Sequence, residues 1–269
     1  MTLSIAIAGA AGRMGRALIR AAAMRGDIRV VGGVERPGGG AIGADLGTLA
    51  GCDPIGVKAT ADIQEAAASA DVWIDFTAPG ATLSALEKLA TSPVRGAIIG
   101  TTGLSAAQEA AISDAAKRLA IVRSGNFSLG VHALAALVRQ AAQKLGVGWD
   151  IEIVETHHWR KVDAPSGTAL LLGEAAAQGR GRTLAESRLP PRDGVGDERP
   201  EGGIGFSSVR GGGIVGQHDV IFAAEREVVT LSHQALDRAV FADGALTAAL
   251  WAADKPPGLY SVSDVLGLQ

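Results

Sequence analysis

The chain has 269 residues, and a hydrophobic content of 47% gives it enough apolar side chains for a substantial core in one large or two ordinary domains. Its net charge of −3 gives no general attraction to nucleic acid, so we expect no nucleic-acid partner. The single cysteine, Cys52, excludes an internal disulfide framework and favours the cytoplasm as its location.

We expect neither a signal peptide nor a membrane span in the N-terminal residues. The first apolar run, residues 3–8, has no basic segment before it and ends at Gly9. Later apolar runs also end at charged residues or glycine, well short of the roughly 20 residues that a membrane span needs. We therefore expect no membrane partner.

The first half of the sequence alternates short β-branched segments with alanine-rich segments, which is typical of βαβ units around a parallel sheet. The strand segments are continuously apolar, as expected when helices cover both faces of a sheet. Ser105 is the expected N-cap of the third helix, and Gln108 completes a capping box. The expected strands are residues 3–8, 30–34, 72–76, 97–100 and 120–123, and the expected helices are residues 13–25, 82–90 and 105–119.

The second half changes character after Asn126. Little helix separates its β-branched segments, which indicates a mixed or antiparallel sheet with strands at residues 151–157, 205–209, 215–223 and 227–232. Residues 190–203, rich in proline, glycine and charge, have the composition of a mobile loop or lid. A helix over residues 234–253 is then expected to bury Leu236, Val240, Leu246 and Leu250.

These patterns place the protein in the α/β class. We expect an N-terminal Rossmann-type, doubly wound parallel sheet and a second α+β domain built on a mixed open sheet. The expected division assigns residues 1–127 and 238–269 to the first domain and residues 128–237 to the second.

A glycine-rich segment directly follows the first strand and opens a helix; it consists of Gly9, Ala10, Ala11, Gly12, Arg13, Met14 and Gly15. Such a turn lets a pyrophosphate approach the backbone at a helix N-terminus, although a tight turn without a ligand is the alternative. Ala11 stands where the commoner motif has its second glycine, so the position between strand and helix is the stronger evidence. Glu35, after the second strand, suits a ribose, and Arg36 suits a 2′-phosphate, so we expect both NADH and NADPH to bind.

Three further polar loops follow expected strands, where ligands bind in open α/β sheets. The first is residues 75–79. The hydroxyls of Thr101 and Thr102 are expected to bind a nicotinamide carboxamide or a substrate carboxylate, unless this loop is an ordinary polar turn. The third loop lies where the domains change, a natural place for a cofactor to meet a substrate. The residues of the last two loops are Gly100, Thr101, Thr102 and Gly103, and Ser124, Gly125, Asn126 and Phe127.

The most distinctive segment begins at the end of a strand of the second domain. Four cationic or protonatable side chains stand within five positions there, namely His157, His158, Arg160 and Lys161. Shortly after them, Ser166 is expected to cap a helix whose first N–H groups would bind a carboxylate. A proton donor would then lie beside an anion site; the alternative is a solvated basic turn.

Together these motifs resemble the 4-hydroxy-tetrahydrodipicolinate reductase family, also called the dihydrodipicolinate reductases. The resemblance extends from Ile5 to Leu266. The glycine-rich turn is shared with many reductases, whereas the H-H-x-x-K-x-D-A-P-S-G-T run from His157 to Thr168 is close to diagnostic.

The resemblance implies hydride transfer from NADH or NADPH to an unsaturated cyclic imine dicarboxylate, with loss of water from the 4-hydroxy substrate, in the diaminopimelate route to lysine. It implies acid/base roles for His157 and Lys161. It also implies a homotetramer formed through the sheet of the second domain, which would bind substrate while the first domain binds the dinucleotide. The implied substrate-binding residues are His158, Lys161, Ser166, Gly167 and Thr168.

Several assignments stay open. Trp159 and Arg160 receive no role, and Arg238 is either a second carboxylate partner or a helix-surface residue. The histidines expected to be packed or capped are His132, His218 and His233. Competing hypotheses are another two-domain reductase, such as an aspartate or homoserine-type dehydrogenase, a nucleotide sensor without turnover, and a metal-dependent hydrolase. The paired histidine and lysine disfavour the first two, and adjacent strand residues, which point to opposite faces, disfavour the third.

Overall fold

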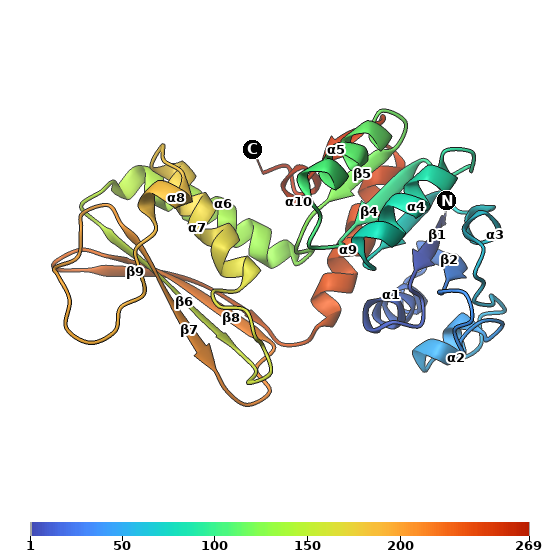
Figure 1. Cartoon of the computed structure of the whole chain (residues 1–269), viewed down its shortest axis with the longest axis horizontal. Helices are drawn as coiled ribbons and strands as arrows, with labels where there is room; N and C mark the ends of the chain where they lie inside the picture. Colours follow the sequence, from blue (N-terminus) through green and yellow to red (C-terminus); the bar gives the residue numbers. More distant parts are fainter. Residues whose placement is uncertain (1, 269) are drawn as a thin grey trace. The chain divides into compact units, whose positions relative to one another are not determined.

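The computed structural model describes residues 2–268 and divides the chain into two compact units (Figure 1). The first unit contains residues 2–128 and Ala239–Gly267, and the second contains Leu129–Arg238 together with Leu268. Each internal junction therefore falls one residue later than expected. No helix in the described part of the chain has the length and apolar character needed to cross a membrane.

The first unit is built on a parallel sheet of six strands in the order β10-β5-β4-β3-β1-β2. The order reverses between β1 and β3, so the loops that follow these two strands lie at the point where doubly wound sheets bind ligands. The sequence analysis did not predict β10, the strand at one edge of this sheet. The six strands are β1 (Leu3–Ala8), β2 (Ile28–Val34), β3 (Val72–Asp75), β4 (Gly96–Ile99), β5 (Ala120–Arg123) and β10 (Gly258–Tyr260).

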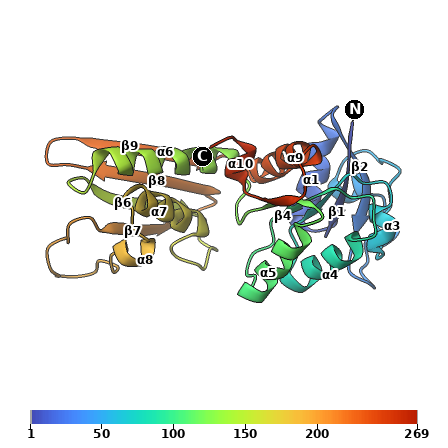
Figure 2. The ribbon, with the colours of Figure 1, turned by 90° about the horizontal axis from the view of Figure 1, so that it is seen from above.

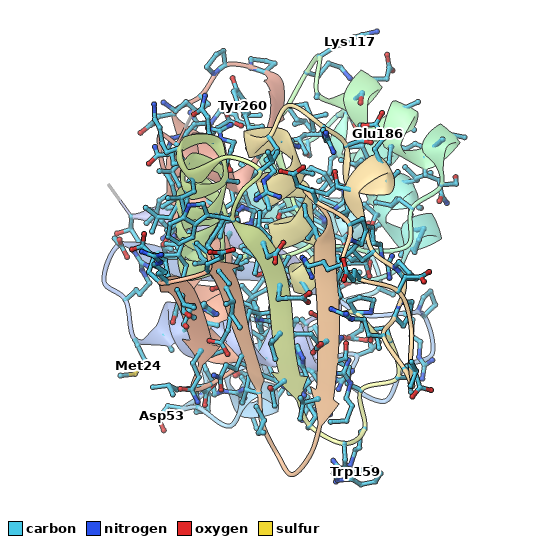
Figure 3. All side chains as sticks on the ribbon, turned by 90° about the vertical axis from the view of Figure 1, so that its left-hand side faces the viewer. Met24, Asp53, Lys117, Trp159, Glu186 and Tyr260 are labelled. Atoms are coloured by element: carbon cyan, nitrogen blue, oxygen red, sulfur yellow. The ribbon has the colours of Figure 1, made fainter. Side chains whose placement is uncertain are left out.

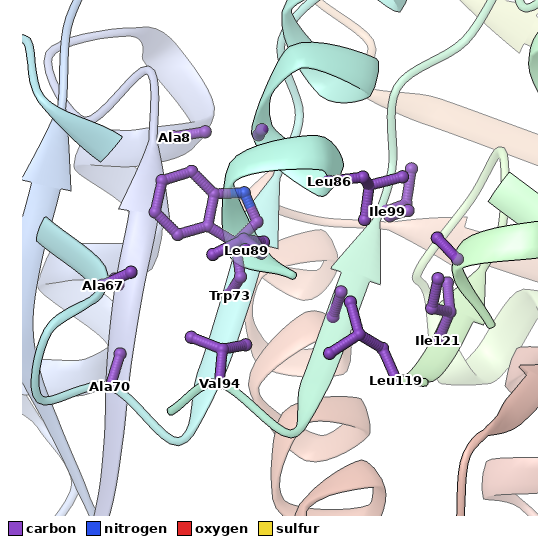
Figure 4. Packing of buried hydrophobic residues seen from close by; sticks show 14 of the residues in the cluster. Ala8, Ala67, Ala70, Trp73, Leu86, Leu89, Val94, Ile99, Leu119 and Ile121 are labelled. Carbon is purple, nitrogen blue, oxygen red and sulfur yellow. The ribbon is translucent and has the colours of Figure 1, made fainter. Parts of the chain in front are cut away.

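Helices cover both faces of this sheet, which explains its continuously apolar strands. Helices α1 and α9 lie on one face and α4 and α5 on the other (Figure 2). On the second face, Trp73 is 1% exposed and packs among aliphatic side chains such as Leu86 and Leu89 (Figure 4). The helices are α1 (Arg13–Ala23), α2 (Leu46–Ala50), α3 (Ile63–Ala67), α4 (Pro79–Leu89), α5 (Ala106–Ala115), α9 (Ala239–Ala253) and α10 (Val262–Val265).

The helix starts predicted from the sequence agree with the structure in some cases and differ in others. Ser105 and Gln108 form the predicted capping box of α5. Helix α4 begins at Pro79, three residues before the predicted start, because proline is well suited to the first turn of a helix. The helix predicted over residues 234–253 is wrong at its start: the chain continues as a strand to Ala235, and Leu236 is 83% exposed instead of buried.

The second unit contains a mixed four-stranded sheet in the order β7-β6-β8-β9. Helices α6 and α7 pack against one face of it (Figure 1), and the α/β fold class with a second mixed sheet is confirmed. Helix α6 was not predicted. The elements are α6 (Leu129–Leu145), β6 (Asp150–His157), α7 (Gly167–Gly179), α8 (Leu184–Ser187), β7 (Ile204–Arg210), β8 (Gly216–Ala223) and β9 (Val228–Ala235).

The loop of residues 190–203, predicted to be a mobile loop or lid, ends beside the start of β6, whereas the basic cluster begins at the end of that strand. It leads into β7 at Ile204, which pairs with Ile151 near the start of β6, six positions before His157. At about 3.3 Å per residue, the end of the loop is about 20 Å from His157. Arg199 fastens the loop there by donating to the carbonyl oxygen of Ile151 at 2.7 Å. Both ends of the loop thus lie near the start of β6, and its role as a mobile loop or lid stays a prediction.

Candidate functional site

The glycine-rich turn joins β1 to α1 and is tight. Gly9 has a φ of +63°, in the left-handed region, and its carbonyl oxygen accepts the N–H of Gly12 at 2.9 Å. A Cβ on Gly15 would overlap the backbone of Gly9 and Ala10, so only glycine lets α1 start this close to the turn. No side chain caps α1, whose first N–H groups have no acceptor within the helix. This cradle of backbone donors fits a pyrophosphate.

Glu35 and Arg36 follow β2 beside the same turn. The N–H of Ala11 donates to Glu35 Oε1 at 2.6 Å, so the acid predicted to bind a ribose reaches the turn. Arg36 and Arg13 are exposed, and Met14 is half-buried. The structure thus brings the predicted glycines, acid and arginine together at the carboxyl ends of β1 and β2.

The loops after β3 and β4 are joined by buried hydroxyls. Thr101 is 1% exposed, and its Oγ1 lies 2.8 Å from Thr82 Oγ1 and 3.3 Å from Asp75 Oδ1. We therefore revise the prediction for Thr101, because its side chain bonds within the protein instead of facing a ligand. Thr102 is exposed, as that prediction requires. Half-buried Gly100 lies so close to the Phe76 ring that a Cβ would overlap it.

The loop after β5 has a closed hydrogen-bond pattern of its own. Ser124 Oγ donates to the carbonyl oxygen of Asn126 at 2.5 Å and accepts the N–H of Asn126 at 3.1 Å. Phe127 is buried, and its ring packs edge-on against Phe76 with centroids 5.3 Å apart. Gly125 is exposed. The loops after β3 and β5 are therefore in contact at this edge of the sheet.

In the second unit, Glu155 holds His157 at the end of β6. The two residues are separated by two positions on a strand, so both face the helices. Glu155 is 0% exposed, and its Oε2 lies 2.5 Å from His157 Nδ1. Arg210 donates to both carboxylate oxygens, at 2.7 and 2.6 Å, and the N–H of Ser166 donates to Oε1 at 3.1 Å. The buried charge is thus paired and hydrogen-bonded.

These contacts set the protonation of the pair. Burial by itself raises the pKa of Glu155, but hydrogen bonds from Arg210, Ser208 and His157 outweigh it and hold the pKa at about 2. Burial is also the largest influence on His157 and lowers its pKa; Glu155 opposes this shift, and Lys161 adds to it. An ionised Glu155 accepts hydrogen bonds and donates none.

Ser166 is the N-cap of α7, as predicted, because its Oγ accepts the N–H three residues on at 3.1 Å. The same oxygen lies 3.0 Å from His218 Nε2, and the Ser166 N–H donates to Glu155. We therefore revise the predicted contact of Ser166 with substrate: protein groups engage both its hydroxyl and its N–H. Gly167 and Thr168 are the first two residues of α7.

His158 and Lys161 lie on the loop that follows β6. Arg238 Nη2 lies 3.1 Å from His158 Nε2, which must accept because a guanidinium only donates. Arg238 precedes α9, so it is a partner of His158 and not a helix-surface residue. Lys161 Nζ donates to both carboxylate oxygens of Asp163 at 2.8 Å. The basic cluster is therefore ordered by specific partners and differs from a solvated turn.

The structure assigns no contact with the site to Trp159 or Arg160. Trp159 is 65% exposed and projects from the tip of its loop (Figure 3), and the guanidinium of Arg160 lies 4.8 Å from its ring centroid. His132 and His218 are buried, and His233 is half-buried. Within residues 2–268, no group of three or more His, Cys, Asp or Glu residues could hold a metal ion.

Sequence reasoning missed Glu155, Arg210 and Asp163. Glu155 had a usable signal: it stands two positions before His157 on a strand whose other inward residues are apolar. Arg210 had none, because it reaches Glu155 only through the pairing of β7 with β6. It also donates to the carbonyl oxygen of Asp163 at 2.7 Å, which ties the loop after β6 to the same carboxylate.

Comparison with known proteins identifies the family. The family model described as dihydrodipicolinate reductase, N-terminus, matches residues 3–127, and the C-terminus model matches residues 130–266. The chain belongs to the dihydrodipicolinate reductase family. The 4-hydroxy-tetrahydrodipicolinate reductase of Rhodopseudomonas palustris (strain BisB18) is 54% identical over 268 residues, which cover 99% of this chain and 98% of that protein. The enzyme of the same name from Rhizobium meliloti (strain 1021) is 51% identical over 267 residues, covering 99% and 98%.

Solved structures agree on the fold. Dipicolinate-bound dihydrodipicolinate reductase from Paenisporosarcina sp. TG-14 has a TM-score of 0.77 at 24% identity, covering 97% of this chain and 98% of that chain. The DAP dehydrogenase of C. glutamicum, in complex with DAP, has a TM-score of 0.56 at 13% identity, and the match covers 97% of this chain and 93% of that chain. Membership of the family makes this protein an NAD(P)H-dependent oxidoreductase, which sets aside the sensor and hydrolase hypotheses.

Proposed function

We propose that this protein reduces 4-hydroxy-tetrahydrodipicolinate to tetrahydrodipicolinate, with loss of water, in the diaminopimelate route to lysine. The observation that carries the proposal is the buried Glu155–His157 pair beside the N-terminus of α7. It puts a nitrogen that can exchange a proton close to backbone donors that can hold a carboxylate. Relatives that match nearly the whole chain carry the name of this activity.

The substrate carboxylates are the groups that the second unit recognises. We assign one of them to the N–H groups of Gly167 and Thr168, which the capping of α7 by Ser166 holds in place. His158 and Lys161 add polar and cationic contacts from the loop after β6. The Paenisporosarcina reductase binds dipicolinate, a dicarboxylate, which supports this class of substrate.

NADH or NADPH fits the loops of the first unit. The glycine turn offers backbone donors to a pyrophosphate, while Glu35 and Arg36 stand where a ribose and a 2′-phosphate would lie. The bound cofactor supplies the hydride. The residues that we assign to its binding are Gly9, Ala10, Ala11, Gly12, Arg13, Met14, Gly15, Glu35, Arg36, Gly100, Thr101, Thr102, Ser124, Gly125, Asn126 and Phe127, with Thr101 acting through its backbone.

His157 handles the proton that the reduced ring requires. In the protonated imidazole, Nδ1 stays hydrogen-bonded to Glu155, and Nε2 gives up its proton. Burial lowers the pKa of His157, which makes it a readier donor than an exposed imidazole. Lys161, which is paired with Asp163, is the second acid/base group of the proposal.

A cytoplasmic homotetramer is part of the same proposal. Helices α6 and α7 cover one face of the second sheet. The opposite face carries apolar, hydroxyl, amide and acidic side chains, and no helix of the described residues packs on it. Such a face suits association with a second copy, because a half-apolar sheet face can be buried by packing against the same face of that copy. Val154, Ile221 and Thr230 lie on it.

The test is an assay of NAD(P)H oxidation with freshly generated 4-hydroxy-tetrahydrodipicolinate. We expect oxidation that depends on both the protein and this substrate. Dipicolinate should inhibit it by occupying the carboxylate site. No oxidation by a protein that still binds cofactor would reject this substrate and favour reduction of a different one.

A further inference from the structure

Glu155 has more partners than the proposed reaction uses. It is fully buried, yet it is ionised, because Arg210, Ser166 and His157 surround its two oxygens with donors. Burying a carboxylate is costly unless such donors compensate for lost water. The residues on the same side of β6, Ile151 and Ile153, are aliphatic. An aliphatic side chain at position 155 would fill the space without needing hydrogen-bond donors around it.

We propose that Glu155 is a positioning residue: it fixes His157 in the Nδ1-protonated form, so that Nε2 is the nitrogen that exchanges a proton with the substrate. The inference rests on the proposed function for the role of His157. It follows from the 2.5 Å contact and from the chemistry of an ionised carboxylate, which accepts hydrogen bonds and donates none. Without this partner, a neutral imidazole can carry its proton on either nitrogen.

The same carboxylate joins three parts of the site. Through Ser166 it contacts the N-terminus of α7, and through Arg210 it contacts the carbonyl of Asp163, whose carboxylate holds Lys161. Glu155 therefore fixes the positions of His157, the N-terminus of α7 and the loop that carries Lys161 relative to one another. It touches neither substrate nor cofactor and acts through these neighbours.

A Glu155→Gln substitution tests this role, because Arg210 and the Ser166 N–H can only donate hydrogen bonds, whereas His157 Nδ1 can either donate or accept. Oε1 receives two groups that can only donate, Arg210 Nη2 and the Ser166 N–H. Oε2 receives one such group, Arg210 Nη1, and His157 Nδ1, which can change its role, so the glutamine oxygen is favoured at the Oε1 position. The glutamine NH₂ then takes the Oε2 position and faces His157 Nδ1. The imidazole can meet a donor only by accepting, so its proton moves to Nε2.

The measurement is ¹⁵N NMR of histidine-labelled protein at a pH where His157 is neutral, with its signals assigned by their loss in His157→Gln. In the wild type we expect Nδ1 to have the shift of a protonated nitrogen and Nε2 that of an unprotonated one. In Glu155→Gln the two shifts should exchange. A wild-type His157 protonated on Nε2 would overturn the proposal even if the variant failed to fold.

The kinetic counterpart is a separation of kcat from KM. We expect Glu155→Gln to lower kcat by about a hundredfold, the scale of one acid/base group, while the Kd for dipicolinate changes by less than about threefold. Unchanged kcat with a correct fold would reject the positioning role. A collapse of dipicolinate binding together with kcat would instead indicate that Glu155 only supports the fold of the site, and would also reject it.

Glu109→Gln is the matched control, because Glu109 likewise pairs with an arginine, Arg123, but contacts no histidine. It should leave the His157 shifts and kcat unchanged. Failure of the proposed reaction is recognised separately: the wild type would then show no turnover, while the NMR comparison would still decide whether Glu155 sets the His157 tautomer.

Discussion

His157 differs from an exposed histidine in its burial and in its fixed partner. Both properties suit an acid/base group, and Lys161, on the loop after β6, carries an ammonium paired with Asp163. We expect His157→Ala and Lys161→Ala each to lower kcat by about a hundredfold or more with folding intact. Steady-state kinetics with circular dichroism as the folding control would check this, and near-wild-type turnover in either variant would remove that residue from the mechanism.

Arg36 is exposed beside the turn that approaches the dinucleotide, next to Glu35. If it pairs with a 2′-phosphate, Arg36→Ala should raise KM for NADPH by about tenfold, the value of one charge-assisted hydrogen bond, and KM for NADH much less. Measuring both cofactors on one preparation makes NADH the internal control. An equal effect on the two would reject contact with the 2′-phosphate.

At the residue scale, sequence reasoning reached what lies close together along the chain. His157, Lys161 and the Ser166 cap follow one another within ten positions, so their spacing indicated an anion site, with a solvated basic turn as the alternative. Arg210 is 55 residues from Glu155 and meets it only because β7 pairs with β6. No local pattern contains that register, so the partner that stabilises the buried charge needed the structure.

Among the elements, β8 and the N-terminus of α7 are joined by His218 and Ser166. Burial, and to a lesser degree the charge on His157, lowers the pKa of His218 to about 4 from its usual 6.5. Between these values the unfolded chain takes up a proton that the folded chain excludes. The free energy of unfolding should therefore fall by up to about 3 kcal/mol as pH drops through this window, and be unaffected by this group above it.

His218→Gln keeps a hydrogen-bonding side chain but removes that titration. Urea unfolding of both proteins between pH 7 and pH 4 should show a shallower loss of stability in the variant. The comparison uses the slope of the free energy of unfolding against pH, so a loss of stability that is the same at every pH does not affect it. Equal slopes would contradict the buried, neutral state of His218.

Five of the six strands of the first unit were predictable, because strands buried on both faces are continuously apolar. Among its helices, α5 has the predicted capping box, whereas no side chain caps α1. Helix α6 was missed, since buried His132 and exposed Leu137 blur its amphipathic pattern. The helix predicted over residues 234–253 began too early, inside β9, because Gln234 and Ala235 fit a helix as well as they fit the ladder with β8. The prediction rested on the helix propensity of these two residues, whereas in the structure their pairing with β8 places them in a strand.

For the whole molecule, the open face of the second sheet is the feature that bears on assembly. Ile221 lies near its middle, paired with Glu152 and Thr230. If this face forms the proposed tetramer, Ile221→Glu should give a smaller species in analytical ultracentrifugation, because it buries a charge without a partner. Ile221→Val is the control and should keep the wild-type mass. A wild type that sediments as a single chain would contradict the proposal.

The central claim is that this chain, acting through His157, delivers hydride and proton to a cyclic imine dicarboxylate. The most direct test is mass analysis of the product formed from 4-hydroxy-tetrahydrodipicolinate with NADH deuterated at C4 of the nicotinamide on the transferred face. The account predicts tetrahydrodipicolinate carrying one deuterium with the wild type, and almost none in the same time with His157→Ala. Product without deuterium, or equal product from both proteins, would contradict it.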